Sequence, residues 1–465
     1  MDNNEMDLEY VEAEDDEDAG EEGMESDNED ETTRTEKPKE VYLPGKPLKE
    51  GEELVCDESA YIMLHQASTG APCLSFDILP DELGAGREKF PLTAYMVAGT
   101  QAASAHVNNL IVMKMDNLHK TQESEEDDED DEELEDDQDD NGDADERKKP
   151  RMTCALIKHQ GCVNRIRARR LGDKVYAASW SELGRVNIWD LSRQLQALED
   201  AQLLKQYERE VVNEAVRPAY TFSGHQQEGF AIDWSACADG VLATGDCKRD
   251  IHIWSPLEGG SWKVDQRPLV GHTASVEDLQ WSPNEASVLA SCSVDKTIRI
   301  WDCRAPPQKA CMLTCDDAHQ SDINVISWND TKPFIVSGGD DGFLHIWDLR
   351  QFQTKKPIAT FKHHTGPIST LEWNPNDATV FASAGDDDQI ALWDLAVEKD
   401  TDQESTPNAT GLEESEDELN KLPPQLLFIH QGQKEIKELH WHAQLPGVIL
   451  STAHSGFNVF RTISV

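Results

Sequence analysis

Histidine, serine and aspartate recur together in the second half of the chain, and these residue types perform nucleophilic catalysis when they lie within hydrogen-bonding distance. Three sets have nearly the same spacing and end in a tryptophan: His272, Ser291, Asp295 and Trp301; His319, Ser337, Asp341 and Trp347; His364, Ser383, Asp387 and Trp393. A buried indole N–H, hydroxyl and imidazole each need a hydrogen-bonding partner, and a carboxylate can complete the series. Because the sets recur, the repeating unit has to be found before any chemistry is assigned.

The repeat is defined by tryptophans that follow short alternating segments such as VNIWDL and IRIWDC. Trp189, Trp254, Trp301, Trp347 and Trp393 are separated by 65, 47, 46 and 46 residues. The last three steps are typical of four-stranded propeller blades. A histidine lies about 29 residues before each of the last four tryptophans, and an apolar alternation such as VEDLQW, which follows it, predicts an inner strand.

This pattern resembles the WD-repeat family over residues 154–465. The resemblance implies that each histidine, strand hydroxyl, turn aspartate and tryptophan form a hydrogen-bonded tetrad within one blade. The third blade departs from the pattern, with Lys248 where the turn aspartate is expected. We therefore expect the recurring histidines to be structural, and neither catalytic nor metal-binding.

The number of blades follows from their third strands. The five tryptophans and Phe460 mark six blades, and residues 108–118 supply a seventh third strand. No residues follow Val465 to form the fourth strand of the last blade, so an earlier segment must complete it, and we expect residues 73–79 to do so. The predicted fold is an all-β, seven-bladed WD40 propeller with a short N-terminal helix, and the long step before Trp254 contains about 20 extra residues of helical composition.

Three stretches carry most of the formal net charge of −49. Residues 1–31 hold 17 acids, residues 123–146 hold 18 acids, neither with a base, and residues 398–418 hold nine acids against one lysine. Such segments lack the apolar surface that offsets ordering entropy, so we expect them to be disordered. The predicted organisation is an acidic tail (1–40), a helix, closing strand and first blade (41–122), an acidic insert (123–150) and blades two to seven (151–465) with an acidic loop (398–421).

Several classes of protein are not expected. The N-terminus lacks the basic and apolar regions of a secretory signal or transit peptide, and no run of about 18 apolar residues exists. The ten cysteines fall singly and are expected to be reduced thiols. Without a phosphate-binding glycine loop, nucleophile elbow or metal-ligand cluster, we expect no enzyme activity, no cofactor and no metal. RKKPR (147–151) fits a nuclear-import signal and equally a local counter-charge.

A narrower resemblance rests on residues 57–81, 95–115 and 422–430. These stretches are similar to the histone-binding WD proteins of the chromatin-assembly and retinoblastoma-binding group. With the acidic segments added, the chain resembles the glutamate-rich WD-repeat family of ribosome-assembly factors. The resemblance implies a nuclear and nucleolar protein that binds a basic client, either a large-subunit ribosomal protein or histones, within pre-ribosomal particles.

In the histone-binding group a basic client helix lies between an N-terminal helix and a loop that ends in two prolines. By position, this resemblance places Tyr61 and Leu64 on one wall, and the other wall contains Asp417, Glu418, Pro423 and Pro424. Ala60, Tyr61 and Leu64 have the spacing of one helix face, which could instead pack on the propeller. The group also reads peptide tails with acids around the ring axis. Glu228 and Glu277 match these acids, whereas Cys162 and Pro367 replace two of them.

The acidic insert predicts a mechanism. Extended at about 3.4 Å per residue, its carboxylates lie well within a Debye length of about 8 Å, so a basic partner would meet several at once. They would also repel nucleic acid, so no direct nucleic-acid binding is expected. We expect the insert to leave the rim between blades one and two and to wrap a cationic client; a solubilising spacer is the alternative. The shielding residues include Glu125, Glu126, Asp127, Asp128, Glu129, Asp130, Asp131, Glu132 and Glu133, and serines followed by acids, candidates for phosphorylation, are Ser26, Ser124 and Ser415.

A second function remains open. Trp301-Asp302-Cys303-Arg304 and Trp347-Asp348-Leu349-Arg350 fit the WD-x-R pattern of substrate receptors for cullin ubiquitin ligases, so Arg304 and Arg350 are candidate contacts for a ligase adaptor. A chromatin regulator that binds histones is a further alternative. Neither excludes a chaperone of basic proteins.

Overall fold

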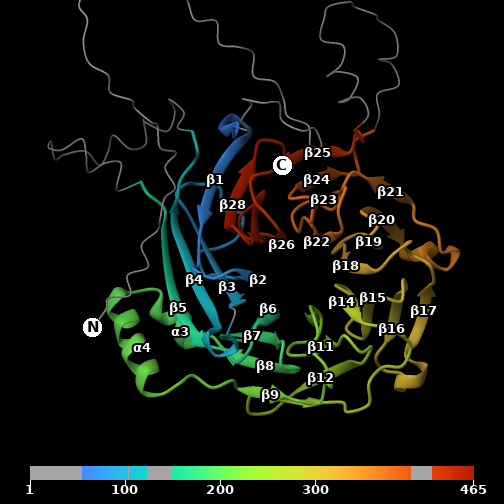
Figure 1. Cartoon of the computed structure of the whole chain (residues 1–465), viewed down its shortest axis with the longest axis horizontal. Helices are drawn as coiled ribbons and strands as arrows, with labels where there is room; N and C mark the ends of the chain where they lie inside the picture. The colour runs from blue at the N-terminus through green and yellow to red at the C-terminus, as the bar shows by residue number, and fades with distance from the viewer. Residues whose placement is uncertain (1–54, 103, 123–147, 399–421) are drawn as a thin grey trace, which may run out of the picture. The chain divides into compact units, whose positions relative to one another are not determined.

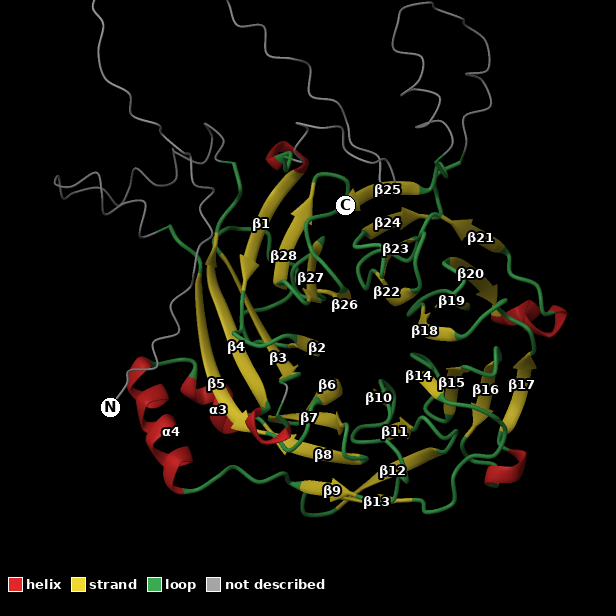
Figure 2. Ribbon diagram, viewed as in Figure 1, coloured by secondary structure: helices red, strands yellow, loops and turns green. Residues whose placement is uncertain are grey.

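The computed structural model describes residues 55–102, 104–122, 148–398 and 422–465. The acidic runs at the N-terminus, between the third and fourth strands of the first blade, and before Leu422 lie outside these residues, as does the question of their order. Residues 58–465 form one compact unit, in which the described strands make seven four-stranded antiparallel sheets. Figures 1 and 2 show these sheets arranged around one axis.

Each sheet is one blade, named from the innermost to the outermost strand. Blade 1 contains β2 (Cys73–Leu79), β3 (Leu92–Thr100), β4 (Asn109–Leu118) and β5 (Arg151–Lys158), and blade 2 contains β6 (Val163–Leu171), β7 (Lys174–Ser181), β8 (Arg185–Asp190) and β9 (Tyr220–Phe222). Blade 3 contains β10 (Ala231–Trp234), β11 (Leu242–Gly245), β12 (Ile251–Leu257) and β13 (Ser261–Val264), and blade 4 contains β14 (Val276–Trp281), β15 (Val288–Ser293), β16 (Ile298–Asp302) and β17 (Cys311–Cys315). Blade 5 contains β18 (Ile323–Trp328), β19 (Phe334–Gly339), β20 (Phe343–Asp348) and β21 (Ala359–Lys362), and blade 6 contains β22 (Ile368–Trp373), β23 (Val380–Gly385), β24 (Ile390–Asp394) and β25 (Leu426–His430). Blade 7 contains β26 (Ile436–Trp441), β27 (Val448–Ala453), β28 (Gly456–Thr462) and β1 (Tyr61–Ala67).

The innermost strands contact one another in the order β2, β6, β10, β14, β18, β22 and β26, and β26 contacts β2 again, so the ring is closed. We call the edge of the sheets where these strands begin the upper face, and the edge where they end the lower face. Clusters of buried apolar side chains fill the spaces between blades; Trp347, for example, packs with β14–β16 residues of blade 4 such as Ile298. The predicted seven-bladed propeller is confirmed.

The predicted closing strand was wrong. Residues 73–79 form β2, the innermost strand of blade 1, and the last blade is completed by β1, in which Leu64 pairs with Phe460 of β28. Both segments alternate between apolar and polar residues, so alternation could not separate them. The difference lies in Ser75 and Asp77, whose side chains accept hydrogen bonds from backbone N–H groups of β6, a role available only to an innermost strand.

The helix expected at Ala60, Tyr61 and Leu64 is absent at these positions. A single 3-10 turn, η1 (Glu58–Ala60), leads directly into β1. Tyr61 and Met63 are buried, as the two-residue period of a strand requires, whereas Leu64 is half-buried. Apolar residues with this spacing fit a strand of aromatic and branched residues as well as a helix.

The expected helical residues after Trp189 form α3 (Ser192–Ala197) and α4 (Ala201–Asn213). They lie beside the outer strand of blade 1 (Figure 1), where Tyr207 donates a hydrogen bond to the carbonyl oxygen of Leu156. Short 3-10 turns also occur at η2 (Ala105–Val107), η4 (Pro307–Lys309) and η5 (Leu349–Thr354).

The acidic insert interrupts blade 1 and does not lie between blades 1 and 2, as predicted. Residues 123–147 separate β4 from β5, and β5 pairs with β4 along its whole length. The predicted boundary at residue 151 therefore divides one sheet.

Candidate protein-binding surfaces

The predicted tetrads of blades 4, 5 and 6 are present and buried. In blade 4, His272 Nε2 lies 2.6 Å from Ser291 Oγ, His272 Nδ1 lies 2.9 Å from Asp295, and Trp301 Nε1 donates to Ser291 Oγ at 2.8 Å. Corresponding contacts join the residues of blades 5 and 6. Both ring nitrogens of each histidine have a partner within the blade, so these histidines stabilise the fold.

The prediction that blade 3 lacks its carboxylate was wrong. Asp246 accepts from His225 at 2.9 Å, and His225 and Trp254 both contact Thr244 Oγ1. The aspartate lies two residues before Lys248, because the turn here is tighter at its start: Asp246 Oδ1 also accepts from the backbone N–H groups of residues 248, 249 and 250. A search at fixed spacing misses this shift.

The predicted client wall at Tyr61 is only partly on the surface. Tyr61 is 8% exposed, its hydroxyl lies 2.8 Å from His430 Nδ1, and its ring meets the edge of Phe428 at 5.4 Å. Tyr61 thus packs on the propeller, which was the alternative that the sequence left open. Leu64 and the β25 residues Leu427 and Phe428 are half-buried around the same cluster.

The opposite wall was predicted at the paired prolines. Pro423 and Pro424 precede β25, where the carbonyl oxygen of Pro423 accepts a hydrogen bond from the N–H of Leu426. Pro424 is exposed and Pro423 is half-buried. Asp417 and Glu418 lie outside the described residues, as do Glu125 to Glu133 and the serines Ser26, Ser124 and Ser415.

Residues that border the acidic insert reach the outermost strand of blade 7. The N–H of Thr121 donates to the carbonyl oxygen of Ile62 at 3.0 Å, and His65 Nε2 lies 2.9 Å from the carbonyl oxygen of His119. On the other side of the insert, the carbonyl oxygen of Lys149 accepts from Asn117. The insert therefore begins beside the strand that carries Tyr61 and Leu64.

Acids gather at the upper end of the ring axis. Glu228 is exposed and accepts from Asn164 Nδ2 at 2.9 Å, whereas Glu277 is half-buried. Burial raises the pKa of Glu277, and the charge of Asp322 raises it further. Glu228 and Glu277 are thus presented at the upper face as predicted.

Sequence comparison by position missed further acids at this face, because they come from the ends of the second strands. Glu182 accepts the N–H of Cys162, and the N–H of Asp386 donates to the carbonyl oxygen of Pro367. Carboxylates therefore lie next to both positions where the expected acids are missing. Asp340 adds another, accepting from Asn324 at 2.8 Å. An acid directly after the second strand of a blade is the signal that would have found them.

The wall of the ring axis holds a buried ion cluster centred on Glu438. Arg165 and Arg167 donate to Glu438 Oε1 at 2.7 and 2.8 Å. Burial opposes ionisation of Glu438, but Arg167 and Arg165 hold its pKa well below its ordinary value. Burial would lower the pKa of His440, but the carboxylates of Glu372 and Glu438 raise it to about 10. The cluster ties blades 2, 6 and 7 together and is stabilised in its charged form.

Arg304 and Arg350 are held flat on the aspartates two residues before them. Arg304 donates to both oxygens of Asp302 at 2.9 and 2.7 Å, and Arg350 contacts Asp348 in the same way at 2.9 and 2.6 Å. Their side chains remain 75% and 68% exposed. Both guanidinium groups are therefore ordered and accessible.

Metal-binding and membrane-spanning features are absent from the part of the chain that the structure describes. No group of three or more His, Cys, Asp or Glu side chains there could hold a metal ion. No helix among those residues is long and apolar enough to cross a membrane.

Comparison with protein families matches two parts of this architecture. Residues 51–119 match the family of the histone-binding protein RBBP4 and its counterpart in the CAF1 complex. Residues 264–302, 309–348 and 355–394 match the family "WD domain, G-beta repeat". Fold and matches together define the class: a seven-bladed WD-repeat propeller whose N-terminal region is of the histone-binding type.

Relatives resemble the chain over nearly its whole length. Protein HEAT STRESS TOLERANT DWD 1 of Arabidopsis thaliana is 45% identical, with 92% of each chain covered. Ribosome assembly protein rrb1 of Schizosaccharomyces pombe is 40% identical, covering 99% of this chain and 91% of the relative. Glutamate-rich WD repeat-containing protein 1 of Dictyostelium discoideum is 43% identical, covering 91% and 85%. The chain belongs to the family of these glutamate-rich WD-repeat proteins.

Proposed function

We propose that the protein is a non-enzymatic chaperone and assembly factor that binds a basic client protein during assembly of the large ribosomal subunit, in the nucleolus and nucleus. The names of its relatives support ribosome assembly, and the histone-binding family match supports a basic client. The observation that carries the proposal is the position of the segments that border the acidic runs.

These borders lie on one side of the ring. The first acidic run precedes η1 and β1 of blade 7, the second follows β4 of blade 1, and the third follows β24 of blade 6. Tyr61 of β1, Leu118 of β4 and Asp394 of β24 all lie at the lower face. Three runs of carboxylates are thus attached to three neighbouring blades at the same face, where one cationic protein could engage all of them.

Electrostatics favours a basic protein over a nucleic acid as the partner. The formal net charge of −49 repels phosphates, whereas closely spaced carboxylates release counterions on meeting Lys and Arg clusters. The half-buried apolar residues around Tyr61, including Leu64, Leu427 and Phe428, would provide the short-range contact that fixes the orientation of the client. Acidic segments that cover the basic surface of a client would keep it from binding RNA prematurely.

The test compares the intact protein with one in which residues 123–146 are replaced by a Gly/Ser segment of equal length. Binding of a histone H3–H4 dimer and of a basic large-subunit ribosomal protein is measured from about 50 to 300 mM salt. The proposal predicts a steep loss of affinity with salt for the intact protein and a flatter one for the replacement. Equal salt dependence of the two proteins would refute the role of the insert.

A second candidate function is supported by the exposed guanidinium groups of Arg304 and Arg350 and by the letters DWD in the name of the plant relative. As a substrate receptor, the protein would contact a cullin-ligase adaptor through these arginines. Replacing both with alanine should abolish co-purification of the adaptor and leave client binding unchanged. An adaptor that still co-purifies would eliminate this candidate.

A further inference from the structure

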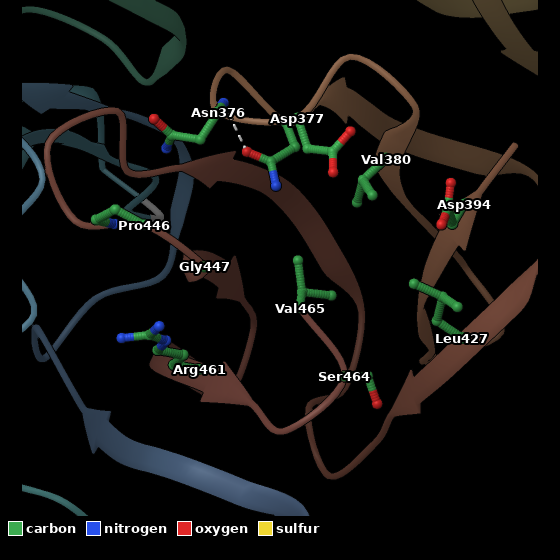
Figure 3. A pocket seen from close by; sticks show the side chains of 11 residues that line it. Asn376, Asp377, Val380, Asp394, Leu427, Pro446, Gly447, Arg461, Ser464 and Val465 are labelled. Carbon is green, nitrogen blue, oxygen red and sulfur yellow. Dashed lines mark hydrogen bonds between the residues drawn. The ribbon is translucent and has the colours of Figure 1, made fainter. Parts of the chain in front are cut away.

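A crevice of about 270 Å³ opens between blades 6 and 7 at the lower face (Figure 3). Its apolar lining includes Val380, Leu427 and Val465, and its acidic lining consists of Asp377 and Asp394. Figure 3 shows the side chains of Asp394 and Leu427 on the side opposite Arg461. The crevice therefore combines an apolar wall with carboxylates.

Asp394 differs from the aspartates at the same position in other blades. The aspartate after the blade tryptophan is paired with a cation in blade 2 (Asp190 with Lys174, 2.7 Å), in blade 4 (Asp302 with Arg304) and in blade 5 (Asp348 with Arg350). In blade 6, residue 396 is alanine where blades 4 and 5 have arginine. Among the described residues, Asp394 has no cationic partner.

The free atoms of the crevice match a peptide with a basic side chain. Asp394 Oδ1 accepts only the N–H of Ala396, and Asp377 Oδ1 accepts from Thr379, so Oδ2 of each aspartate accepts no hydrogen bond from the described residues. Asn374 is 6% exposed, and its oxygen accepts the N–H of Asn376. Its amide N–H groups have no hydrogen-bonding partner among the described residues, and they could donate to a backbone carbonyl of a partner.

The single cation of the lining does not neutralise these acids. Arg461 lies 4.0 Å from Glu88, outside the crevice, and forms no ion pair with Asp377 or Asp394. An arginine has a planar cation that matches a carboxylate and a methylene stem that packs on apolar surface. The crevice offers both features within one residue's length.

We propose that this crevice is a subsite for one arginine side chain of the basic client, with Asp394 and Asp377 contacting the guanidinium and with Val380, Leu427 and Val465 packing on its stem. The inference rests on the proposed function and assigns it a specific contact. The subsite lies next to the segment that enters the third acidic run, since Asp394 ends β24. Long-range attraction by the acidic runs would bring the client in, and the crevice would fix its register.

Three variants test the subsite by anisotropy titration with the H3–H4 dimer and the ribosomal protein. Asp394→Asn removes the carboxylate, and Ala396→Arg supplies an internal arginine like those of blades 4 and 5. Asp302→Asn makes the same charge change as Asp394→Asn on blade 4 and is the control. We expect about tenfold weaker binding of the tighter-binding probe for both blade 6 variants and less than about twofold change for the control.

The outcomes are distinguishable. If the intact protein binds neither probe, the proposed function fails and the subsite with it. If the intact protein binds but Asp394→Asn and Ala396→Arg stay within about twofold of it, only the subsite is refuted, and equal losses in Asp302→Asn would refute it as well. Should Ala396→Arg unfold, shown by a shifted melting curve, Asp394→Asn decides alone.

Discussion

At the scale of single residues, the tetrads show what a repeat reveals and where it stops. Those of blades 4 to 6 could be predicted because three copies share one spacing. Asp246 could not, because its turn displaces the carboxylate by two residues, and only the contact with His225 reveals it. The acids Glu182, Asp340 and Asp386 were missed for a similar reason: they reach the ring axis from second strands.

The shifted tetrad makes a prediction about stability. Asp246→Ala leaves His225 and three backbone N–H groups without their acceptor in a buried turn, which should cost about 2 to 4 kcal/mol of unfolding free energy. Lys248→Ala changes an exposed side chain and should cost less than about 0.5 kcal/mol. Urea unfolding measures both values, and a larger loss for Lys248→Ala would contradict the assignment.

The ion cluster predicts how stability depends on pH. The pKa of His440 is raised to about 10 in the folded protein, so its charge stabilises the fold fully below about pH 6.5, the ordinary pKa of histidine, and this contribution is lost as the pH rises through 10. The pKa of Glu438 is lowered, so its contribution is present above its ordinary value and is lost in strong acid.

His440→Gln should therefore remove part of the alkaline loss. We expect the intact protein to lose on the order of 2 to 4 kcal/mol more than the variant between about pH 6.5 and 10.5, measured by urea unfolding. Parallel curves for the two proteins would show that His440 is not protonated in the fold.

At the scale of elements, the ring closes through β1, which the sequence could not separate from β2. The two segments have the same alternation and both precede blade 1, whereas their roles depend on contacts hundreds of residues away: β1 pairs with β28, and β2 meets Glu438 of β26. The helical insert and the third strand of blade 1 were recognisable because composition and alternation are local properties. The crevice combines two turns, strand residues and the segment after β28, and no local pattern predicts it.

The assignment of β1 predicts the effect of truncation. Removing residues 1–57 should leave the melting temperature nearly unchanged, because the compact unit begins at Glu58. Removing residues 1–67 exposes the edge of β28 and the apolar cluster that contains Tyr61, Phe460 and Leu439, so this protein should aggregate or melt well below the intact one. Size-exclusion chromatography with thermal melting checks both. A stable, monomeric protein without residues 58–67 would contradict closure by β1.

At the scale of the whole molecule, a closed propeller positions the attachment points of three acidic runs at blades 6, 7 and 1 of one face. The charge and the repeat could be predicted from sequence, but the convergence could not, because it depends on β1 joining the last blade and on the insert interrupting blade 1. If one client meets all three runs, their effects are coupled by effective concentration. Removing any two runs should then weaken binding more steeply than the separate losses predict.

The most direct test of the account is calorimetric titration of a basic large-subunit ribosomal protein and of the H3–H4 dimer into the intact protein, and into one whose three acidic runs are replaced by Gly/Ser segments of equal length. The account predicts that the intact protein binds one of these clients at least about a hundredfold more tightly at moderate salt, and that the difference shrinks as salt rises. Equal affinity of the two proteins for both clients would contradict it.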